Sequence, residues 1–284
     1  MPSALKTPQK TIQPVPEAEV VTFLGRETEG RDSETYKAQI IDDQDRTVTA
    51  YVKLTLDARK IIAELAASQV GRALQLNIPK PFLVLVNTDD IPSEFESAFA
   101  GRGYMLCFAS KQVSDQGYSL ERAFRTEPSH ASLAISKHFD MNSAVAFDEL
   151  VANTDRNLGN LIYSPEKKDV WMIDHGQALT GSYWDLWDLV PDCYAANVLA
   201  DRNSHSWDEG RRRAVLAAAQ KMVIACAELS LDDIDKEGHY SRIDTGTDRV
   251  QIAAFFKERL QHTVPLLCKR LQIEQLLLLQ PPRT

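Results

Sequence analysis

Two neighbouring segments constrain this 284-residue chain more than any other feature. The first reads NTDRNLGNLIY (residues 153–163) and the second reads VWMIDHGQAL (residues 170–179). Each contains a short apolar run, and the turn-like sequence SPEKKD lies between the two runs, which predicts a hairpin with strands at 161–163 and 170–173. Asn160 precedes the first strand and Asp174 follows the second, so we expect the hairpin to bring these two side chains to one edge.

The polar residues around this hairpin predict phosphoryl-transfer chemistry. Asp155 and Asn160 are five residues apart, which is the spacing of aspartate and asparagine in a kinase catalytic loop, and Asp174-His175-Gly176 stands in the place of the kinase Asp-Phe-Gly. An aspartate beside the acceptor hydroxyl accepts its proton, while amide and carboxylate oxygens are hard ligands of the kind that Mg²⁺ takes. We therefore predict Asp155 as the catalytic residue, and Asn160 and Asp174 as ligands of Mg²⁺. Gly176 is expected to let the backbone turn without a Cβ clash, and His175 to have a structural role.

Lys53 and Glu64 extend the predicted site into the first part of the chain. Lys53 stands near the end of an alternating run at 47–54 that predicts a half-buried strand, and Glu64 lies on the following helix, which Asp57 is expected to cap. In kinases such a lysine neutralises the α- and β-phosphates of ATP, and a glutamate of the next helix holds it in position. The spacing of 11 residues between Lys53 and Glu64 allows one loop and two helical turns.

Two further segments complete the predicted nucleotide site. The strand at 104–108 leads from the strand-rich part of the chain to the helical part, and the backbone of Cys107, Phe108 and Ala109 is predicted to bind adenine as a hinge. Between the first two predicted strands, the sequence GRETEGRDSETY contains only two glycines, so there is no clear glycine-rich phosphate loop. The stretch 30–33, which includes Ser33, is the candidate for covering the phosphates through backbone N–H groups.

Secondary-structure patterns divide the chain into three parts. Residues 1–19 contain four prolines among mostly polar residues and are predicted to form a flexible leader. Residues 20–110 are predicted to form a nucleotide-binding N-lobe, and residues 111–284 a helical C-lobe with the catalytic and metal-binding loops. The expected fold class is α+β: a two-lobed, protein-kinase-like fold with an antiparallel sheet in the N-lobe and a mostly helical C-lobe. The N-lobe is predicted to contain strands at 20–24, 35–41, 47–54, 82–86 and 104–108, with a helix ending near Asn77.

Composition narrows the partners and the compartment. The net charge of −8 and the isoelectric point near 5.3 disfavour direct nucleic-acid binding. No apolar stretch approaches the roughly 20 residues of a membrane span, and no signal-peptide pattern opens the chain. The four cysteines form no C-x-x-C pair. We therefore expect a cytoplasmic protein with reduced thiols and no membrane association.

These motifs resemble the HipA-like serine/threonine kinases, in particular the short members that carry only the kinase domain. The resemblance extends from Val20 to Leu271 and rests on Lys53 and the segments ELAASQVGRALQLNIPKPF, FDELVANTDRNLGNLI and MIDHG. It implies that Asp155 is the catalytic aspartate, that Asn160 and Asp174 bind Mg²⁺, and that Lys53 contacts the phosphates of ATP. A protein substrate and a regulatory partner protein are further expectations.

Two other functions remain open. The Asp-Arg-x-x-x-Asn and Ile-Asp-x-Gly patterns are also similar to those of phosphatidylinositol kinases, so a lipid or a small molecule is an alternative acceptor on the same scaffold. The weak phosphate loop favours a pseudokinase that binds nucleotide and acts as an interaction module. The complete set of Lys53, Asn160 and Asp174 disfavours that alternative, because a non-catalytic scaffold does not need all three.

Overall fold

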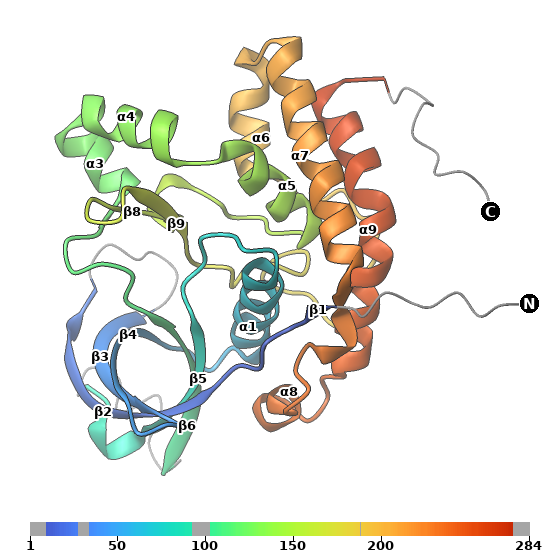
Figure 1. Cartoon of the computed structure of the whole chain (residues 1–284). Coiled ribbons are helices and arrows are strands. Elements are labelled where there is room, and N and C mark those ends of the chain that lie inside the picture. The colour runs from blue at the N-terminus through green and yellow to red at the C-terminus, as the bar shows by residue number, and fades with distance from the viewer. Residues whose placement is uncertain (1–9, 28–33, 93–102, 188, 275–284) are drawn as a thin grey trace, which may run out of the picture.

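The first part of the chain forms a closed β-barrel, at the lower left of Figure 1. The computed structural model describes residues 10–27, 34–92, 103–187 and 189–274. The barrel strands are β2 (Glu17–Arg26), β3 (Glu34–Asp42), β4 (Thr47–Leu54), β5 (Pro81–Asn87) and β6 (Tyr104–Lys111), in the order β2-β3-β4-β6-β5. Neighbouring strands are antiparallel except for β2 and β5, which run parallel and close the barrel.

The closing pair corrects the expected antiparallel sheet. Strand β5 is almost entirely buried, and an unpaired edge on a buried strand leaves its backbone N–H and C=O groups without partners. The start of β2 covers this edge, with Glu17 opposite Leu83 and Glu19 opposite Leu85. The bounds of the predicted strands agree with the structure to within a few residues, and β4 spans the predicted 47–54.

Helix α1 (Ala58–Ala73) lies between the barrel and the helical part of the chain (Figure 1). Asp57 caps it as predicted, because its side chain accepts a backbone hydrogen bond from the first turn at 3.1 Å. A left-handed residue, Gln75 (φ 62°), ends the helix in a Schellman motif, about one turn before the predicted end near Asn77. The helix is buried on all sides from Ile61 to Gly71, so Glu64 lies inside the protein.

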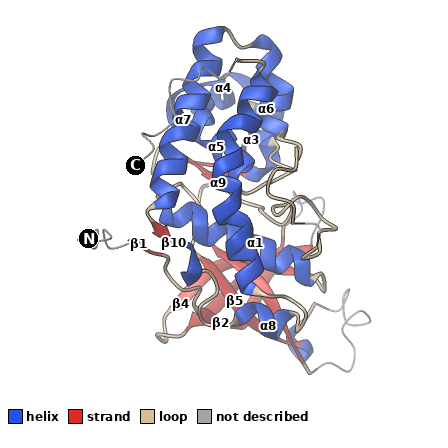
Figure 2. Cartoon of the chain, turned by 90° about the vertical axis from the view of Figure 1, so that its right-hand side faces the viewer, coloured by secondary structure: helices blue, strands red, loops and turns tan. Residues whose placement is uncertain are grey.

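The second part of the chain is mostly helical, above the barrel in Figures 1 and 2. Helix α7 (Glu209–Ala227) packs against both α5 (Met141–Leu150) and α9 (Arg249–Leu271). The predicted hairpin is confirmed as β8 (Leu161–Ser164) and β9 (Asp169–Met172), which form a small sheet with β7 (Tyr118–Ser119). The shorter elements are η1 (Thr88–Asp90), α3 (Leu120–Thr126), α4 (Pro128–His138), η3 (Leu158–Asn160), α6 (Val198–Asn203), η4 (Ser204–Ser206), η5 (Leu231–Asp233) and α8 (His239–Ile243). Over the described ranges, no helix has both the length and the apolar character of a membrane span.

The start of the described chain corrects the predicted leader. Strand β1 (Lys10–Thr11) pairs in parallel with β10 (Leu229–Ser230), beside the C-terminal helices (Figure 2). Ile12 and Val15 are 2% and 3% exposed and belong to the large core. From Lys10 onward the predicted leader is therefore packed against the rest of the protein. The burial of apolar surface on Ile12 and Val15 stabilises this arrangement.

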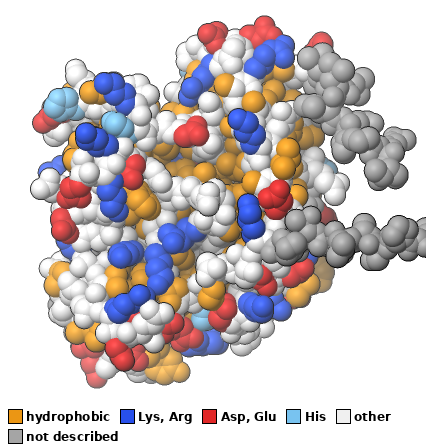
Figure 3. All heavy atoms as spheres, in the orientation of Figure 1, with side chains coloured by type: hydrophobic (Ala, Val, Ile, Leu, Met, Phe, Trp, Pro, Cys, Tyr) orange, Lys and Arg blue, Asp and Glu red, His pale blue; other side chains and the backbone are white. Residues whose placement is uncertain are grey.

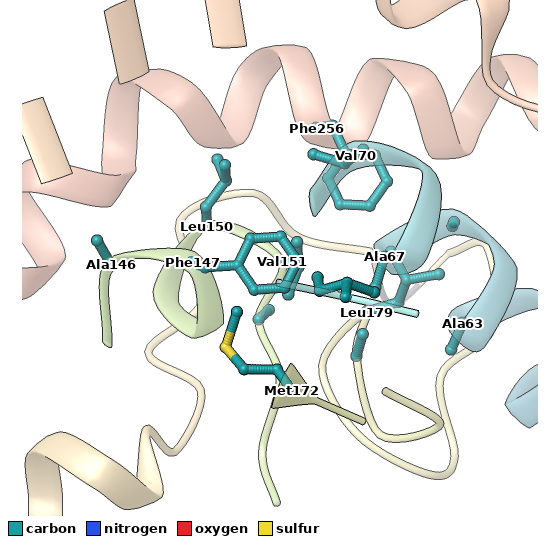
Figure 4. Packing of buried hydrophobic residues seen from close by; sticks show 14 of the residues in the cluster. Ala63, Ala67, Val70, Ala146, Phe147, Leu150, Val151, Met172, Leu179 and Phe256 are labelled. Atoms are coloured by element: carbon teal, nitrogen blue, oxygen red, sulfur yellow. The ribbon is translucent and has the colours of Figure 1, made fainter. Parts of the chain in front are cut away.

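Two hydrophobic cores hold these elements together. One fills the barrel, and the larger one joins α1, α5, α7, α9 and the β8–β9 hairpin. Figure 4 shows the centre of the larger core, where side chains of α1, α5, β9 and α9 meet: Ala63, Ala67, Val70, Ala146, Phe147, Leu150, Val151, Met172, Leu179 and Phe256. This core therefore positions the elements that carry Glu64, the 151–160 loop and Asp174 relative to one another.

Candidate active site

A cavity of about 530 Å³ gathers most of the predicted site. Its walls come from β4 and β6 of the barrel, from α1, and from the segments on both sides of the β8–β9 hairpin. Six predicted residues line it: Lys53, Glu64, Phe108, Asp155, Asn160 and Asp174. Ser33 lies outside the described residues. Lys111, Arg122 and Arg202 also line the cavity, and Figure 3 shows Lys and Arg side chains gathered on the left of one face of the molecule.

Lys53, on β4 of the barrel, contacts both α1 and the segment that follows β9. Its Nζ donates hydrogen bonds to Oε1 of Glu64 and, at 2.7 Å, to Oδ1 of Asp174. The Lys53 side chain is 14% exposed and that of Glu64 is 1% exposed. Burial alone would lower the pKa of Lys53, but the carboxylates of Asp174 and Glu64 outweigh it and hold the pKa above its ordinary value. The lysine is therefore a fixed positive charge at the wall of the cavity.

Glu64 connects Lys53 to the segment that follows the hairpin. Its Oε2 accepts a hydrogen bond from the backbone N–H of His175 at 2.9 Å, and the imidazole Nδ1 of His175 lies 3.7 Å away. Burial would raise the pKa of Glu64, but the nearby Lys53 and His175 hold it below its ordinary value. His175 is 1% exposed and packs edge-to-face on Phe147. Burial, together with the positive charge of Arg156, lowers the pKa of His175, which suits the structural role predicted for it.

The loop that carries Asp155 holds its polar side chains in fixed orientations. Nδ2 of Asn160 donates to the backbone carbonyl of Asp155 at 2.5 Å. Because a carbonyl can only accept, this hydrogen bond identifies which end of the Asn160 amide is nitrogen and directs Oδ1 away from the loop backbone. Nδ2 of Asn157 donates to Oδ1 of Asp155 at 3.2 Å, which helps to orient the carboxylate.

Arg156 ties this loop to the hairpin, a role that the sequence interpretation missed. Its guanidinium donates to the backbone carbonyl of Asn160, a predicted metal ligand, at 3.3 Å, and to that of Ile173, the residue before the other predicted ligand, Asp174. Arg156 is fully buried and pairs with Asp148 of α5 at 3.2 Å. The backbone N–H of Ile173 also donates to the carbonyl of Asn160 at 3.0 Å. The available signal was the position of Arg156 directly after the predicted catalytic aspartate, but sequence alone does not show that it is buried.

The backbone at Asp174 corrects the explanation offered for Gly176. A Cβ added at Gly176 would meet its nearest neighbour at 3.5 Å, an ordinary contact, and its φ is not in the left-handed region. Asp174 itself has a φ of 58°, in the left-handed region, which is uncommon for a residue with a side chain but which Asp adopts more readily than most residues. The turn in the chain is therefore made by the aspartate, and Lys53 and the hydrogen bonds around Glu64 support it.

Strand β6 corrects the predicted adenine hinge. It lies between β4 and β5, and its backbone at 107–109 is paired on one side or both. Cys107 and Ala109 point into the barrel core, where burial raises the pKa of the Cys107 thiol to about 12. Phe108 has the opposite orientation and faces the cavity, because successive side chains of a strand point to opposite faces. The chain beyond it lines the cavity through Ser110, Lys111, Val113 and Ser114.

The donor set fits a hard divalent cation that completes its shell with phosphate oxygens. Asn160 presents an amide oxygen, and the Asp174 carboxylate is 36% exposed and lines the same cavity. Among the residues that the structure describes, there is no cluster of three or more His, Cys, Asp or Glu side chains suited to a metal. Two protein oxygens are what Mg²⁺ commonly uses beside a nucleotide, whereas a zinc site needs a larger set of protein ligands.

Comparison with known proteins agrees with this geometry. The sequence profile of the HipA-like kinases matches residues 21–186, which include all six residues that line the cavity as predicted. The chain belongs to the HipA-like kinase family. The resemblance inferred from the motifs is thereby confirmed at the level of the family.

Solved structures add evidence on the fold. A crystal structure of a Helicobacter pylori proinflammatory kinase, CtkA, matches 90% of this chain and 99% of its own, at 11% identity and a TM-score of 0.50, which supports a kinase-like fold. The open conformation of CtTel1 matches 84% of this chain and 11% of its own, at 15% identity, but its TM-score of 0.33 is too low to carry an argument. No curated protein sequence matches the chain.

Proposed function

We propose that this HipA-like kinase transfers the γ-phosphate of ATP, with Mg²⁺, to a serine or threonine hydroxyl of a protein substrate. The observation that carries the proposal is the pairing of Lys53 with both Glu64 and Asp174, in a cavity that Asp155 and Asn160 also line. A triphosphate needs a fixed cation and ligands for a metal ion at the same place.

Each residue has a distinct role in the proposed reaction. Lys53 holds the α- and β-phosphates, and Glu64 holds Lys53. The Asp155 carboxylate orients the acceptor hydroxyl and accepts its proton as the oxygen bonds to the γ-phosphorus. The bond from that phosphorus to the β,γ-bridging oxygen breaks, and ADP leaves with the electron pair. Asn160 and Asp174 would hold Mg²⁺, which supplies positive charge that stabilises the phosphates.

Binding of the nucleotide requires Asp174 to change partners. Its Oδ1 accepts a hydrogen bond from Lys53. In the proposed complex, Lys53 binds the phosphates and the Asp174 carboxylate coordinates the metal ion. Glu64 keeps Lys53 in place during this exchange, because Glu64 is almost completely buried and is tied to the His175 backbone.

The proposed adenine site depends on which side chains of β6 face the cavity. We place the base against Phe108 and the chain beyond it, in place of the backbone of Cys107 and Ala109. The barrel within residues 20–110 then acts as the N-lobe and the helical part within 111–284 as the C-lobe, with the cavity between them. Ser33 remains the proposed phosphate-covering residue.

The compartment and the partners complete the proposal. The four cysteines are free thiols, and Cys107, Cys226 and Cys268 are buried. Such thiols suit a reducing compartment, and we propose the cytoplasm. A regulatory partner protein belongs to the proposal through the family and not through a feature of this chain.

The test is phosphate transfer from γ-labelled ATP to proteins of a cell extract, with identification of the modified residue. Transfer to serine or threonine that requires Mg²⁺ and is lost in Asp155→Asn supports the proposal. Transfer to a lipid or a small molecule would show that the acceptor is not a protein. Binding of ATP without transfer to any acceptor, in wild type and Asp155→Asn alike, would favour the pseudokinase.

A further inference from the structure

The most exposed large hydrophobic side chains of the described chain lie just after the candidate active site. Tyr183 and Trp187 are each 88% exposed, whereas other exposed hydrophobic residues reach at most 64%. Aromatic side chains contribute large apolar areas, and their exposure in a folded protein commonly marks a site of recognition. Exposure alternates along this stretch, because Trp184 is 4% exposed between them and Leu186 is half-buried. Tyr183, Asp185 and Trp187 are the exposed residues of this stretch, and we name them the exposed triplet.

Contacts within the segment hold the exposed triplet in place. Oδ1 of Asp185 accepts a hydrogen bond from the backbone N–H of Trp187 at 2.9 Å, which fixes the carboxylate relative to the second aromatic residue. Trp184 and Leu186 pack against the large core from the inner side. The triplet is thus displayed on an anchored segment.

The segment is fastened to the catalytic loop at its start. The backbone N–H of Thr180 donates to the carbonyl of Ala152 at 3.1 Å, and Gly181 lies against the side chain of Thr154, the neighbour of Asp155. Thr180 has a φ of 80°, a strained conformation for a β-branched residue, and it turns the chain toward the surface. Tyr183 follows two residues after Gly181, within roughly 7 Å along the chain. The triplet therefore begins a few residues after a segment that is hydrogen-bonded to the loop carrying Asp155.

Two buried arginines of α9 fasten the far end of the segment. Arg259 is fully buried and donates to the carbonyls of Pro191 at 2.8 Å and Cys193 at 2.7 Å. Arg270 donates to the carbonyl of Ala195, and Glu149 of α5 pairs with both arginines. A buried guanidinium group needs hydrogen-bond acceptors, and here the backbone carbonyls of the segment supply them. These hydrogen bonds fix the position of the far end of the segment.

The chemistry of the triplet selects a cation. Two aromatic side chains flank a carboxylate, and Lys or Arg binds favourably over aromatic faces and beside carboxylates. Within the described part of the chain, no lysine or arginine is paired with Asp185 or with the exposed Asp192 that follows. The neighbouring Tyr194 already has Arg270 4.3 Å and Lys269 4.9 Å from its ring centroid, which shows how this segment accommodates cations. The net charge of −8 further favours a basic partner.

We propose that the exposed triplet is the docking site for a basic segment of the protein substrate, with an Arg or Lys side chain between Tyr183 and Trp187 and against Asp185. This inference rests on the proposed function, since it names the class of acceptor that the same active site serves. It assigns substrate selection to a surface that neither ATP nor the metal ion touches.

The test measures binding of three labelled synthetic peptides of equal length, each with one central serine, flanked by arginines, glutamines or glutamates. The arginine peptide is expected to bind about tenfold more tightly than the glutamine peptide, and the glutamate peptide most weakly. Tyr183→Ala/Trp187→Ala should remove the preference, while Ile224→Ala, an exposed apolar residue on α7, should retain it. Asp185→Lys keeps both aromatic residues and should shift the preference toward the glutamate peptide, mainly through KM in transfer assays.

Equal affinity for the three peptides, or wild-type preference in the Tyr183→Ala/Trp187→Ala variant, would overturn the proposal. A wild-type dimer that this variant converts to monomer would also overturn it, because the triplet would then be an interface between copies. Calorimetry with Mg²⁺ and ATP separates this failure from failure of the proposed function. A peptide preference without ATP binding would support the docking site and contradict the kinase function. Phosphate transfer without a peptide preference would support the kinase function and contradict the docking site.

Discussion

Replacement of Lys53 by methionine tests the ion pairs and the proposed catalysis together. Methionine keeps most of the apolar stem but removes the ammonium group that Glu64 and Asp174 share. Asp174 is 36% exposed and can be solvated, whereas Glu64 is 1% exposed and retains the hydrogen bond from the His175 backbone N–H. Loss of one partner from a buried ion pair costs about 3–5 kcal/mol. We expect the lower end, about 3 kcal/mol, because the His175 backbone N–H still donates to Oε2.

The expected pH dependence follows from the pKa of Glu64. In wild type Lys53 holds this pKa below its ordinary value, so the stability from the carboxylate is present above pH 4.5 and is lost as the pH falls through the folded pKa. In Lys53→Met, burial dominates and raises the pKa of Glu64, so acid relieves the penalty in the variant. Both effects make the difference in stability largest near neutral pH and smaller below about pH 5.

The assay is thermal and chemical unfolding of wild type, Lys53→Met, Glu64→Gln and the double variant across this pH range. At pH 7 Lys53→Met should melt about 6–10 °C lower, and the double variant should lose less than the sum of the single losses, because the uncompensated carboxylate is gone. Phosphate transfer should be abolished in Lys53→Met and reduced less in Glu64→Gln. A Lys53→Met protein with wild-type stability at every pH would refute the buried ion pair, and wild-type transfer would refute its proposed function.

Four further predictions address the site and the core. Asp155→Asn should lower turnover by about two to four orders of magnitude with ATP affinity nearly unchanged, and Asp174→Asn should weaken ATP binding in calorimetry; proportional losses in both would contradict their separate roles. EDTA should weaken ATP binding to wild type, and equal affinity with and without the chelator would contradict the metal site. Arg156→Met should destabilise the fold by about 3–5 kcal/mol in urea unfolding, and Arg156→Lys should not rescue it because the forked contacts are lost. Gly71→Ala places a Cβ 2.2 Å from a side-chain carbon and should cost about 1–3 kcal/mol, whereas Gly210→Ala, with its nearest contact at 3.5 Å, should stay within about 1 kcal/mol of wild type.

Local patterns predicted the elements well, because the residues that specify them are close in sequence. The alternation at 47–54 predicted the bounds of β4, Asp57 caps α1, and the apolar runs around SPEKKD form β8 and β9. The spacing of Asp155 and Asn160 placed them in one loop, and both line the same cavity. Periodicity, capping and turn composition are properties of a few neighbouring residues, so a single sequence suffices for them.

The predictions that failed depended on contacts between distant elements, or on which face of a strand each side chain occupies. Whether Cys107 or Phe108 faces the cavity depends on the register of β6 between two partners, and a shift of one residue exchanges the faces. The parallel closure of β2 on β5 and the burial of Ile12 and Val15 likewise depend on elements that are distant in sequence.

Sequence by itself determined which residue types stand beside the hairpin, at what spacing, and hence the family and the chemistry expected of the site. Only the tertiary structure decided that Lys53 meets a carboxylate 121 residues away, that Arg156 is fully buried against Asp148, and that Asp174 rather than Gly176 makes the turn. The physical reason is that burial and the pairing of charges depend on how separate elements pack. An arginine or aspartate has the same local sequence whether it faces water or the core, and only the packed chain distinguishes the two.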